Sequence, residues 1–585
     1  MKTDIVANPP CDRQNQWYGG NREPLSEAPF TKLPLGNIQP RGWLQHQLQK
    51  MVKGMTGHLR ELSSYLTDTN GWLGTDEQGW EEQPYWLRGF YPLAVLTGDE
   101  ECMDTAQRWV EAILQNQDQD GYWGPAERRR IPVRLGPPQY DLWGQMVMCD
   151  ALEQHYEYTG DTRVLDVMER FFNFCQSLPD EEFLPFTFKS FDDRNGVIKY
   201  LLNGYGAAHI QNRRCGEMIP HIHWLYNRTG RSELLSLAER FYQKILPNMN
   251  EWLDHHVINF IHRYAFPAYF YPQSGDRGHL CESEYWYQQH MQTWGQQPRG
   301  MFAADELTRS DKTDPRYAFE TCGFGEFLRV FSRLGCMSGD PMYADRSEDI
   351  ILNHFPAAQS PDLKGLHYLT PTNVVQLDNS NKHDFQNEGG GSTEAHLPYS
   401  PHTYRCCQHN VAQTWPWYAQ SLWLATADDG LAAWLYASST VTARIGGEGQ
   451  TITVSADTAY PFDDTVELNM AIDEPTEFPL YLRIPRWCTD FAVYVNEGSV
   501  DIAPTPGAFL RICREWTDGD RVKVVMPMEL SITQWPRNQS LTVDRGPLSY
   551  SLRIEEDWQQ CGGDERWPQE SPRRPSQPPL RAYGW

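Results

Sequence analysis

Apolar residues recur at helical spacing from about Leu44 to Leu424, and a short polar turn interrupts them repeatedly. The turns read LTGDE, YTGDT, RTGRS, QSGDR and MSGDP, and they fall at Thr97, Thr159, Thr229, Ser274 and Ser338. An aromatic-rich apolar run precedes each turn, and an amphipathic run follows it. Glycine suits the left-handed end of one helix, and the polar residue after it suits the start of the next. The pattern therefore predicts a series of helical hairpins.

Helical hairpins of this kind either stack into an open solenoid or close into a ring. The first helix of each pair carries the more aromatic face, as in HIHWLYN and HRYAFPAYFYP. Such faces suit helices that line the inside of a ring. We therefore expect a closed (α/α) barrel and keep the open solenoid as the alternative.

The pattern changes after Asp428-Asp429-Gly430 to alternation with a period of two, and turn residues follow about every ten positions. Segments such as QTITVSADTAY, TVELNMAI and RVKVVMPM read as strands, and together they predict a β-sandwich. The proline-rich end is a linker, an arm laid over another domain or part of a further module. The expected divisions are an N-terminal arm (1–43), a helical barrel that holds the catalytic site (44–427), a β-sandwich (428–555) and a proline-rich C-terminal segment (556–585).

Composition narrows the range of partners. The chain has 585 residues, 40% of them hydrophobic, and a formal net charge of -26. Nucleic acids and anionic membranes are bound through basic faces, so this charge argues against both as partners. The start of the chain lacks the apolar run of a secretory leader, and no segment has the length needed to span a bilayer. These features predict a soluble cytoplasmic protein.

The cysteines are the first sign of chemistry. Thirteen of them are scattered without the regular spacing of a disulfide framework, which indicates mostly reduced thiols. Cys406 and Cys407 are adjacent, and neighbouring cysteines rarely bridge to each other because the ring is strained. Glu320 and Cys322 flank Thr321 in YAFETCGFGEF. The two motifs together supply three thiols and a carboxylate, a complete tetrahedral set for Zn²⁺; taken singly, each motif reads as buried cysteine beside a solvated acid.

Four motifs in order along the chain carry a family resemblance. GMFAADE is followed by FETC, then GLHYLTPTN, then YRCCQHN, with hairpin repeats before and a sandwich after. Over most of Leu44 to Leu552 this order resembles glycoside hydrolase family 127, the β-L-arabinofuranosidases. The resemblance implies a mainly helical fold with added β-structure, an (α/α)6 barrel packed on a β-sandwich. It also implies zinc held by one glutamate and three cysteines, here Glu320, Cys322, Cys406 and Cys407.

The resemblance also implies a retaining mechanism. The first cysteine of the pair is the nucleophile in that family, so the role falls on Cys406. The glutamate of the GMFAADE motif, Glu306, is then the general acid/base. Asp305 beside it is a rival for that role. Zinc deprotonates a coordinated thiol, and a carboxylic acid protonates the departing oxygen, so the assignment is chemically coherent.

The substrate-binding positions match the family less evenly. His256 stands where the family has a sugar-binding histidine, and Tyr368 matches a tyrosine near the sugar. Two further family histidines have no counterpart here, and Gln145 and Glu217 stand nearby instead. The cysteine pair is also followed by Gln408-His409 where arabinofuranosidases commonly have two prolines. These departures leave the predicted metal ligands and nucleophile unchanged, but they leave the identity of the sugar undetermined.

Three functional hypotheses follow. The leading one is a zinc-dependent retaining glycoside hydrolase that removes a terminal sugar, β-L-arabinofuranoside-like or another uncommon sugar, from a plant or algal glycan. The second is a non-catalytic carbohydrate-binding protein with a purely structural zinc. The third is a sugar isomerase or lyase on the same barrel. The expected partner is an oligosaccharide or glycoside; the oligomeric state is left open, with a homodimer as one option.

Overall fold

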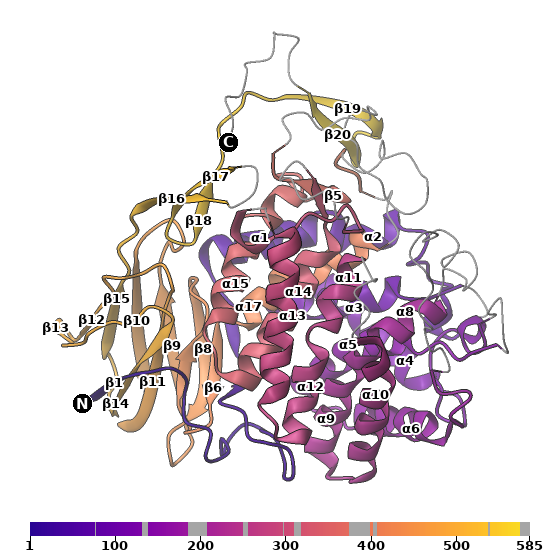
Figure 1. Ribbon diagram of the computed structural model, residues 1–585, viewed down its shortest axis with the longest axis horizontal. Coiled ribbons are helices and arrows are strands. Elements are labelled where there is room, and N and C mark those ends of the chain that lie inside the picture. The colour runs from indigo at the N-terminus through magenta and orange to yellow at the C-terminus, as the bar shows by residue number, and fades with distance from the viewer. Residues whose placement is uncertain are drawn as a thin grey trace.

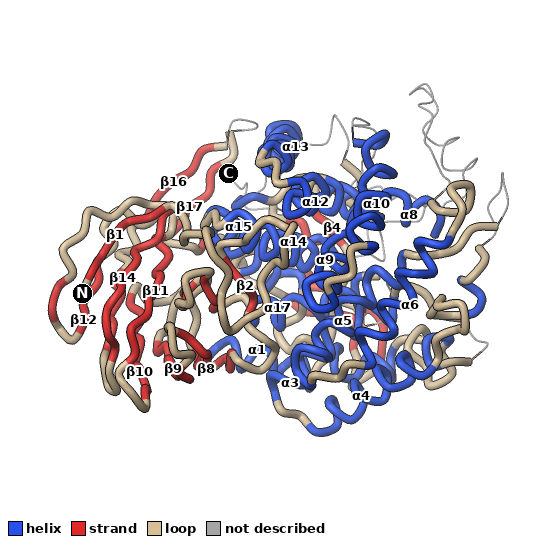
Figure 2. Tube along the Cα trace, turned by 90° about the horizontal axis from the view of Figure 1, so that it is seen from below, coloured by secondary structure: helices blue, strands red, loops and turns tan. Residues whose placement is uncertain are grey.

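The computed structural model describes residues 1–75, 78–131, 138–184, 207–249, 256–295, 298–308, 317–373, 398–401, 406–535 and 539–573. Most of the strands lie to one side of the helices, while β4 and β5 lie among the helices (Figures 1 and 2). The helical part follows a short N-terminal segment, and the strand-rich part follows the last helix.

The α-helices are α1 (Gly42–Lys53), α2 (Met55–Leu62), α3 (Glu82–Thr97), α4 (Glu100–Gln115), α5 (Trp143–Thr159), α6 (Arg163–Ser177), α8 (Ala207–Arg214), α9 (Met218–Thr229), α10 (Glu233–Met249), α11 (Val257–Arg263), α12 (Phe266–Ser274), α13 (Gly278–Trp294), α14 (Cys322–Ser338), α15 (Met342–Ile351), α16 (Cys407–Asn410) and α17 (Thr414–Gln420). Short 3-10 turns are η1 (Gly71–Leu73), η2 (Ala126–Arg128), η4 (Cys215–Glu217), η5 (Pro298–Gly300), η6 (Phe355–Ala358) and η9 (Val411–Gln413).

The helices form a closed ring of hairpins. The inner helices α3, α5, α9, α12, α14 and α17 each contact the next, and α17 contacts α3 to close the ring. The outer partners of the first five are α4, α6, α10, α13 and α15, while α17 pairs with α1 from the start of the chain. The expected (α/α) barrel is thus confirmed for the part of the chain that the structure describes, and the open solenoid is excluded.

The predicted turns mark the ends of the inner helices. Gly98, Gly160, Gly230, Gly275 and Gly339 are their C-caps, with φ of 66°, 72°, 71°, 67° and 77°. Only glycine adopts this left-handed conformation without a steric penalty, which explains its recurrence after Thr or Ser. These turns lie at one end of the barrel, and the N-terminal ends of the inner helices gather at the other end.

The strands are β1 (Lys2–Val6), β2 (Phe30–Lys32), β3 (Ile38–Pro40), β4 (Ala318–Glu320), β5 (Leu369–Pro371), β6 (Trp423–Thr426), β7 (Leu431–Ala433), β8 (Ser439–Ile445), β9 (Gln450–Asp457), β10 (Thr465–Ile472), β11 (Thr476–Ile484), β12 (Ala492–Val495), β13 (Gly498–Ser499), β14 (Ala508–Trp516), β15 (Arg521–Val525), β16 (Leu530–Gln534), β17 (Leu541–Arg545), β18 (Leu548–Tyr550), β19 (Asp557–Gly563) and β20 (Pro568–Arg573).

Two large sheets make the sandwich. One has the order β1-β14-β11-β7-β6-β2, and the other has the order β13-β12-β15-β10-β9-β8-β3. Burial alternates along β8, β9 and β10, because each strand turns one face to the core and the other to solvent. Smaller sheets pair β16-β17-β18, β19-β20 and β4-β5.

The N-terminal segment, expected as an arm, supplies strands to both sheets. β1 pairs with β14, β2 with β6 and β3 with β8, all antiparallel. The first forty residues therefore belong structurally with the strands that follow the barrel, and the N-terminus lies among them in Figure 2.

The start of the C-terminal segment lies over the helical domain. The β19-β20 hairpin sits above β5 in Figure 1, and Glu570 exchanges two backbone hydrogen bonds with Tyr399. Trp558 stacks on the ring of Tyr399 with centroids 5.4 Å apart. Of the three options that the composition left open, the described part fits an arm laid over another domain.

A buried ion pair links sandwich and barrel. Arg483 in β11 has no exposed surface and lies 2.6 Å from Asp345 and 2.7 Å from Glu348, both in α15. Its Nε also donates to the Trp434 carbonyl. A charge this deeply buried is tolerated only with such partners, so the contact fixes the position of α15 against the sheet.

Candidate active site

The four predicted ligands lie where short strands give way to helices. Glu320 is the last residue of β4, and Cys322 is the first residue of α14. Cys406 and Cys407 occupy the N-cap and first position of α16. Helix N-termini carry partial positive charge and unpaired amides, which favours thiolate and carboxylate groups there.

The structure brings the four ligand side chains together. Cys406 Sγ lies 3.8 Å from Cys407 Sγ and 3.8 Å from Glu320 Oε1, and Cys407 Sγ lies 3.1 Å from Cys322 Sγ. All four ligand atoms lie within 4.8 Å of one another. Thiolates bound to zinc at about 2.3 Å in a tetrahedron lie about 3.8 Å apart, so the arrangement fits such an ion. The cluster could hold a metal, and its soft donor set suits zinc.

The electrostatics of the cluster also fit a cation. Burial raises the pKa of Glu320 well above its ordinary value, and the charge of Cys406 raises it further. Burial likewise raises the pKa of Cys322 and Cys407. Glu320 Oε2 is buried without a hydrogen-bond partner. A bound divalent cation would satisfy this oxygen and stabilise the deprotonated thiols.

Cys406 differs from its neighbour. The thiols of Cys322 and Cys407 hydrogen-bond it and hold its pKa well below the ordinary value, with a smaller contribution from the Tyr368 hydroxyl. Cys406 is partly exposed, whereas Cys407 is fully buried. Of the adjacent pair, Cys406 is therefore the thiol that a substrate can reach.

Glu306 and Tyr368 lie directly beside Cys406. The Tyr368 hydroxyl donates to Glu306 Oε1 at 2.9 Å and lies 3.9 Å from Cys406 Sγ. His256 Nε2 lies 3.8 Å from the same carboxylate oxygen. His256 is the N-cap of α11, and its Nδ1 accepts from the Ile258 amide. The predicted nucleophile, acid and two substrate-binding residues thus share one site.

Backbone pairing explains how these segments meet. β4 pairs with β5 so that Glu320 lies opposite Leu369, next to Tyr368. The Glu320 amide donates to the Ala304 carbonyl, and the Val257 amide donates to the Glu306 carbonyl. Glu306 has a φ of 80°, an unusual conformation for a residue with a side chain. Such strained positions are held by their surroundings and concentrate at functional sites.

Gln145 and Glu217 make contacts away from the cluster. Gln145 in α5 donates to the Trp123 carbonyl at 2.6 Å. Glu217 in η4 accepts from Arg329 at 2.6 Å and from Arg333 at 3.1 Å. Glu217 is therefore part of a buried ion-pair network inside the barrel, and a contact with the sugar stays a prediction for both residues.

That ion-pair network supports α16, the short helix that begins at Cys407. Its members come from α3, α5, η4, α11 and α14 and are Arg88, Asp150, Glu217, His262, Glu326, Arg329 and Arg333. Asn410, three residues after Cys407, accepts from Arg88 at 2.6 Å and donates to Glu326 at 3.1 Å. Burial raises the pKa of Glu326, but the cations Arg88 and Arg329 outweigh it and hold that pKa well below its ordinary value. Sequence reasoning missed this network, although Glu326 lies one turn after Cys322.

A close backbone contact between α3 and η9 also holds α16 in position. A Cβ on Gly89 of α3 would lie 2.1 Å from the Ala412 carbonyl carbon, so only glycine lets α3 pass η9. On the other side, His409 Nε2 lies 2.7 Å from Ser63 Oγ. The short helix that bears the cysteines is thus held from two directions.

Comparison with protein-family models shows to which family the chain belongs. The model of the GH127 β-L-arabinofuranosidase catalytic domain matches residues 60–420, and that of the GH127 middle domain matches residues 430–528. The chain belongs to the GH127 β-L-arabinofuranosidase family. As a member of GH127 it is a glycoside hydrolase, and its substrate is a glycan. The predicted family and enzyme class are confirmed.

Solved GH127 structures share the fold. A GH127 β-L-arabinofuranosidase from Geobacillus stearothermophilus T6 superposes with a TM-score of 0.64 at 18% identity, covering 88% of this chain and 86% of its own. A GH127 β-arabinofuranosidase gives 0.62 at 15% identity, with coverages of 93% and 91%. A structure described as a glycoside hydrolase gives 0.65 at 16%, with 89% and 83%. No curated protein matches the chain.

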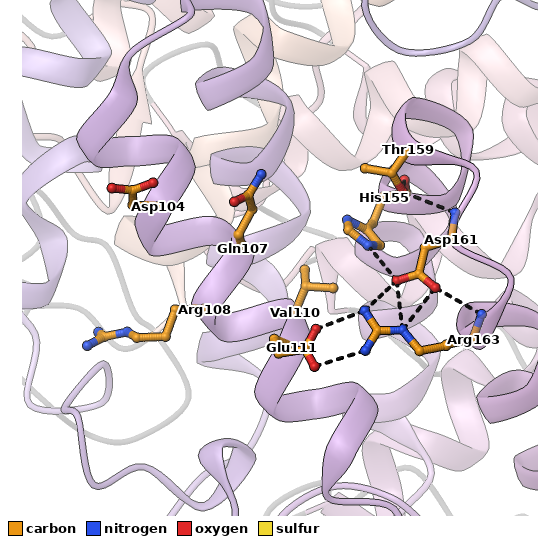
Figure 3. A pocket seen from close by; sticks show the side chains of 9 residues that line it. All are labelled: Asp104, Gln107, Arg108, Val110, Glu111, His155, Thr159, Asp161 and Arg163. Carbon is orange, nitrogen blue, oxygen red and sulfur yellow. Dashed lines mark hydrogen bonds and ion pairs between the residues drawn. The ribbon is translucent and has the colours of Figure 1, made fainter.

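One open cavity of this GH127 member lies outside the cysteine cluster. It has a volume of about 560 Å³ and is lined by Asp104, Gln107, Arg108, Val110, Glu111, His155, Thr159, Asp161 and Arg163 (Figure 3). Arg163 pairs there with Glu111 at 2.8 Å and with Asp161 at 2.7 Å. Arg163 thus bridges two carboxylates of the lining, and the cavity contains no cysteine.

None of the helices in the described ranges combines the length and apolarity needed to cross a bilayer.

Proposed function

We propose that this GH127 member is a zinc-dependent retaining glycosidase that removes a terminal sugar, β-L-arabinofuranoside-like or another uncommon sugar, from a plant or algal glycan. The observation that carries the proposal is the contact of one hydroxyl, that of Tyr368, with both Glu306 Oε1 and Cys406 Sγ. Two groups that touch the same hydroxyl are close enough to flank a single anomeric carbon.

The ligands of the metal would be Glu320, Cys322, Cys406 and Cys407. When bound, zinc supplies a positive charge that keeps the thiols deprotonated at neutral pH and so removes the need for a separate base. Everything else in the reaction falls to side chains of this chain.

In the first step the Cys406 thiolate attacks the anomeric carbon. A C–S bond forms as the glycosidic C–O bond breaks, and the carboxylic acid of Glu306 gives its proton to the departing oxygen. In the second step a water attacks the same carbon, and its proton passes to the Glu306 carboxylate. The C–S bond breaks and the thiolate is restored, so the two inversions retain the anomeric configuration.

Tyr368 and His256 position the acid. The Tyr368 hydroxyl donates to Glu306, which fixes the carboxyl group beside the thiol. His256 approaches the same oxygen from the start of α11. Both groups hold Glu306 in place while its protonation state changes, which is the pre-organisation that proton transfer requires.

The proposal is tested with aryl glycosides of neutral and acidic pentoses and hexoses. We expect release of the phenol from at least one of them, with the first-formed sugar keeping its anomeric configuration in time-resolved proton NMR. An inverted first product would rule out the double displacement. Phenol release that is unchanged in Cys406→Ala would rule out the thiol as nucleophile.

A further inference from the structure

One buried arginine beside the site stands without an ionic partner. Arg214, the last residue of α8, is 4% exposed. Its Nε donates to Asn259 Oδ1 at 2.7 Å, and its Nη1 donates to the Tyr85 hydroxyl at 3.3 Å. Its guanidinium lies over the Trp143 ring, 4.9 Å from the centroid. All three neighbours are electrically neutral.

The third guanidinium nitrogen of Arg214, Nη2, is available for a further hydrogen bond. Among the residues that the structure describes, nothing hydrogen-bonds Arg214 Nη2, and no carboxylate oxygen lies within 4.0 Å of the guanidinium. The C-terminal end of α8 offers only a partial negative charge, which compensates a fraction of the cation. The guanidinium therefore keeps a donor edge free for an incoming group.

Three arginines that are still more deeply buried in the barrel and sandwich are paired with carboxylates. Arg88 pairs with Glu326, Arg329 pairs with Glu217 at 2.6 Å, and Arg483 pairs with Asp345 at 2.6 Å. Removing an arginine from water is costly, and a carboxylate partner normally offsets that cost. Arg214 lacks such a pair among the described residues and so differs from these three arginines.

Arg214 lies on the wall of the active site. Its partner Asn259 follows His256 by three residues on α11, so the two share one face of that helix. Its positive charge also reaches the predicted ligand Glu320, where it offsets a small part of the rise in pKa that burial and the Cys406 charge cause. The open donor edge thus stands beside the groups that surround Cys406.

Glu81 lies close enough for its charge to act on Arg214, but the two form no ion pair. Glu81 accepts from the Trp143 indole at 2.6 Å, one turn before Tyr85. Burial raises the pKa of Glu81 to about 8 although the Arg214 charge lowers it, and this rise favours the protonated carboxyl group.

We propose that Arg214 receives a carboxylate carried by the sugar, so that the substrate of this site is a sugar acid. The ligand then supplies the missing half of the ion pair, through the planar, charge-assisted contacts by which arginine recognises carboxylates. Glu81 and Asn259 stand on the same wall and suit the neighbouring hydroxyls. This inference rests on the proposed function and specifies the class of its sugar.

Binding tests the inference without catalysis. Calorimetric titration of the full-length, zinc-supplemented protein compares D-glucuronate and D-galacturonate with D-glucose and D-galactose. We expect at least one acid to bind about tenfold to a hundredfold more tightly than its neutral counterpart, the range of a charged hydrogen bond. Arg214→Gln should abolish this preference, and Arg214→Lys should keep part of it. Arg163→Gln, which removes an arginine from the remote cavity, should leave it unchanged.

The outcomes separate this inference from the hydrolase assignment. If no acid binds better than its neutral counterpart, or if the preference survives in Arg214→Gln, the inference is wrong whatever the enzyme hydrolyses. If the acid is preferred but no aryl glycoside of a neutral or acidic sugar is cleaved, the subsite stands and the hydrolytic mechanism fails. If Arg214→Gln does not fold, a reduced preference in Arg214→Lys supports the inference, and an undiminished preference there or no preference in the wild type overturns it.

Discussion

The two adjacent cysteines have the same chemistry and different surroundings. Cys406 is partly exposed and lies 3.9 Å from the Tyr368 hydroxyl, while Cys407 is buried against Cys322 at 3.1 Å. A sugar in the site can approach only the first. The proposed roles of the two cysteines therefore differ because they occupy successive positions at the start of α16.

We predict that Cys406→Ser lowers kcat/KM by about four orders of magnitude, a loss typical of removing a nucleophile. A sugar with an electrophilic anomeric centre should label Cys406 in the wild type, as peptide mass spectrometry would show. Cys11→Ser, at an exposed thiol far along the chain, is the matched control and should keep full activity. Labelling of Cys407 or of a carboxylate would contradict the assignment.

We predict that Glu306→Gln loses activity mainly on substrates with poor leaving groups. Activated aryl glycosides need little protonation, so their hydrolysis should fall less, whereas alkyl glycosides should lose about a hundredfold or more. The measurement is the ratio of kcat/KM values for the two substrate types. Asp305→Asn serves as the comparison; if it changes the ratio and Glu306→Gln does not, Asp305 is the acid.

At this scale the family resemblance indicated the ligands and their neighbours Glu306, His256 and Tyr368, whereas the Glu320 and Cys322 motif taken singly reads as a buried cysteine beside a solvated acid. The sequence did not show the contacts, because Tyr368 comes beside Glu320 only through the pairing of β4 with β5. Glu217 looked like a substrate contact because it lies near a position of a family histidine. In the structure Arg329 and Arg333 engage it, a charge balance that depends on residues more than a hundred positions away.

At the scale of elements, a network of buried charges supports the cysteine helix α16. Glu326 of α14 touches Arg88, Arg329 and Asn410, and Asn410 is the last residue of α16. The network therefore transmits the packing of the inner helices to the thiols. A change in it should alter the metal site without touching a ligand.

We predict that Glu326→Gln lowers the free energy of unfolding by about 3–5 kcal/mol, because it leaves buried arginines without their counter-charge. Metal content should fall as well, which a merely local packing defect would not cause. Urea unfolding and metal analysis of the purified variant are the measurements. Glu111→Gln, which removes a partner from a solvent-exposed pair, should change neither quantity measurably.

The stability that Glu326 contributes should depend on pH in a definite direction. The folded-state pKa of Glu326 is lowered, so its contribution is complete above the ordinary glutamate pKa of about 4.3 and is lost as pH falls through the lower folded value. The difference in stability between wild type and Glu326→Gln should therefore shrink in strong acid. A difference that grows on acidification would contradict the ion-pair account.

Elements with local signals could be predicted, and those with distant partners could not. The glycine turns after Thr97 and Thr159 announced helix ends because left-handed caps depend on neighbouring residues alone. The strands β1, β2 and β3 are short, and each is a strand only because it pairs with a partner more than 390 positions later. Strand formation depends on such pairing more than on composition, so the sequence alone indicated an arm.

At the scale of the whole molecule, the metal cluster joins segments from distant parts of the barrel. Cys322 begins α14, whereas Cys407 begins α16 after the last hairpin, and both helices pack against inner helices of the ring. An ion held by both would tie the final part of the barrel to the earlier part. Its removal should be felt well beyond the site.

We predict that a strong chelator abolishes activity and lowers the melting temperature by several degrees, since an ion that binds only the folded chain stabilises it by mass action. Added Zn²⁺ should restore both quantities, and Mg²⁺, which prefers oxygen ligands, should restore neither. Cys322→Ser should resemble the chelated wild type and respond weakly to zinc. Equal, negligible zinc in wild type and Cys322→Ser would contradict a zinc site.

The pairing of the first forty residues with the sandwich has a consequence for synthesis on the ribosome. β1 cannot find its place until β14 (Ala508–Trp516) has emerged, whereas the barrel is complete in sequence at Gln420. At about 5–20 residues per second, the 96 residues from Gln420 to Trp516 take roughly 5–20 s, and during this time β1 waits beside a ring that is already able to close. Newly made chains therefore pass through a long-lived stage with unpaired strand edges, and their yield should depend on chaperones that shield those edges until translation ends.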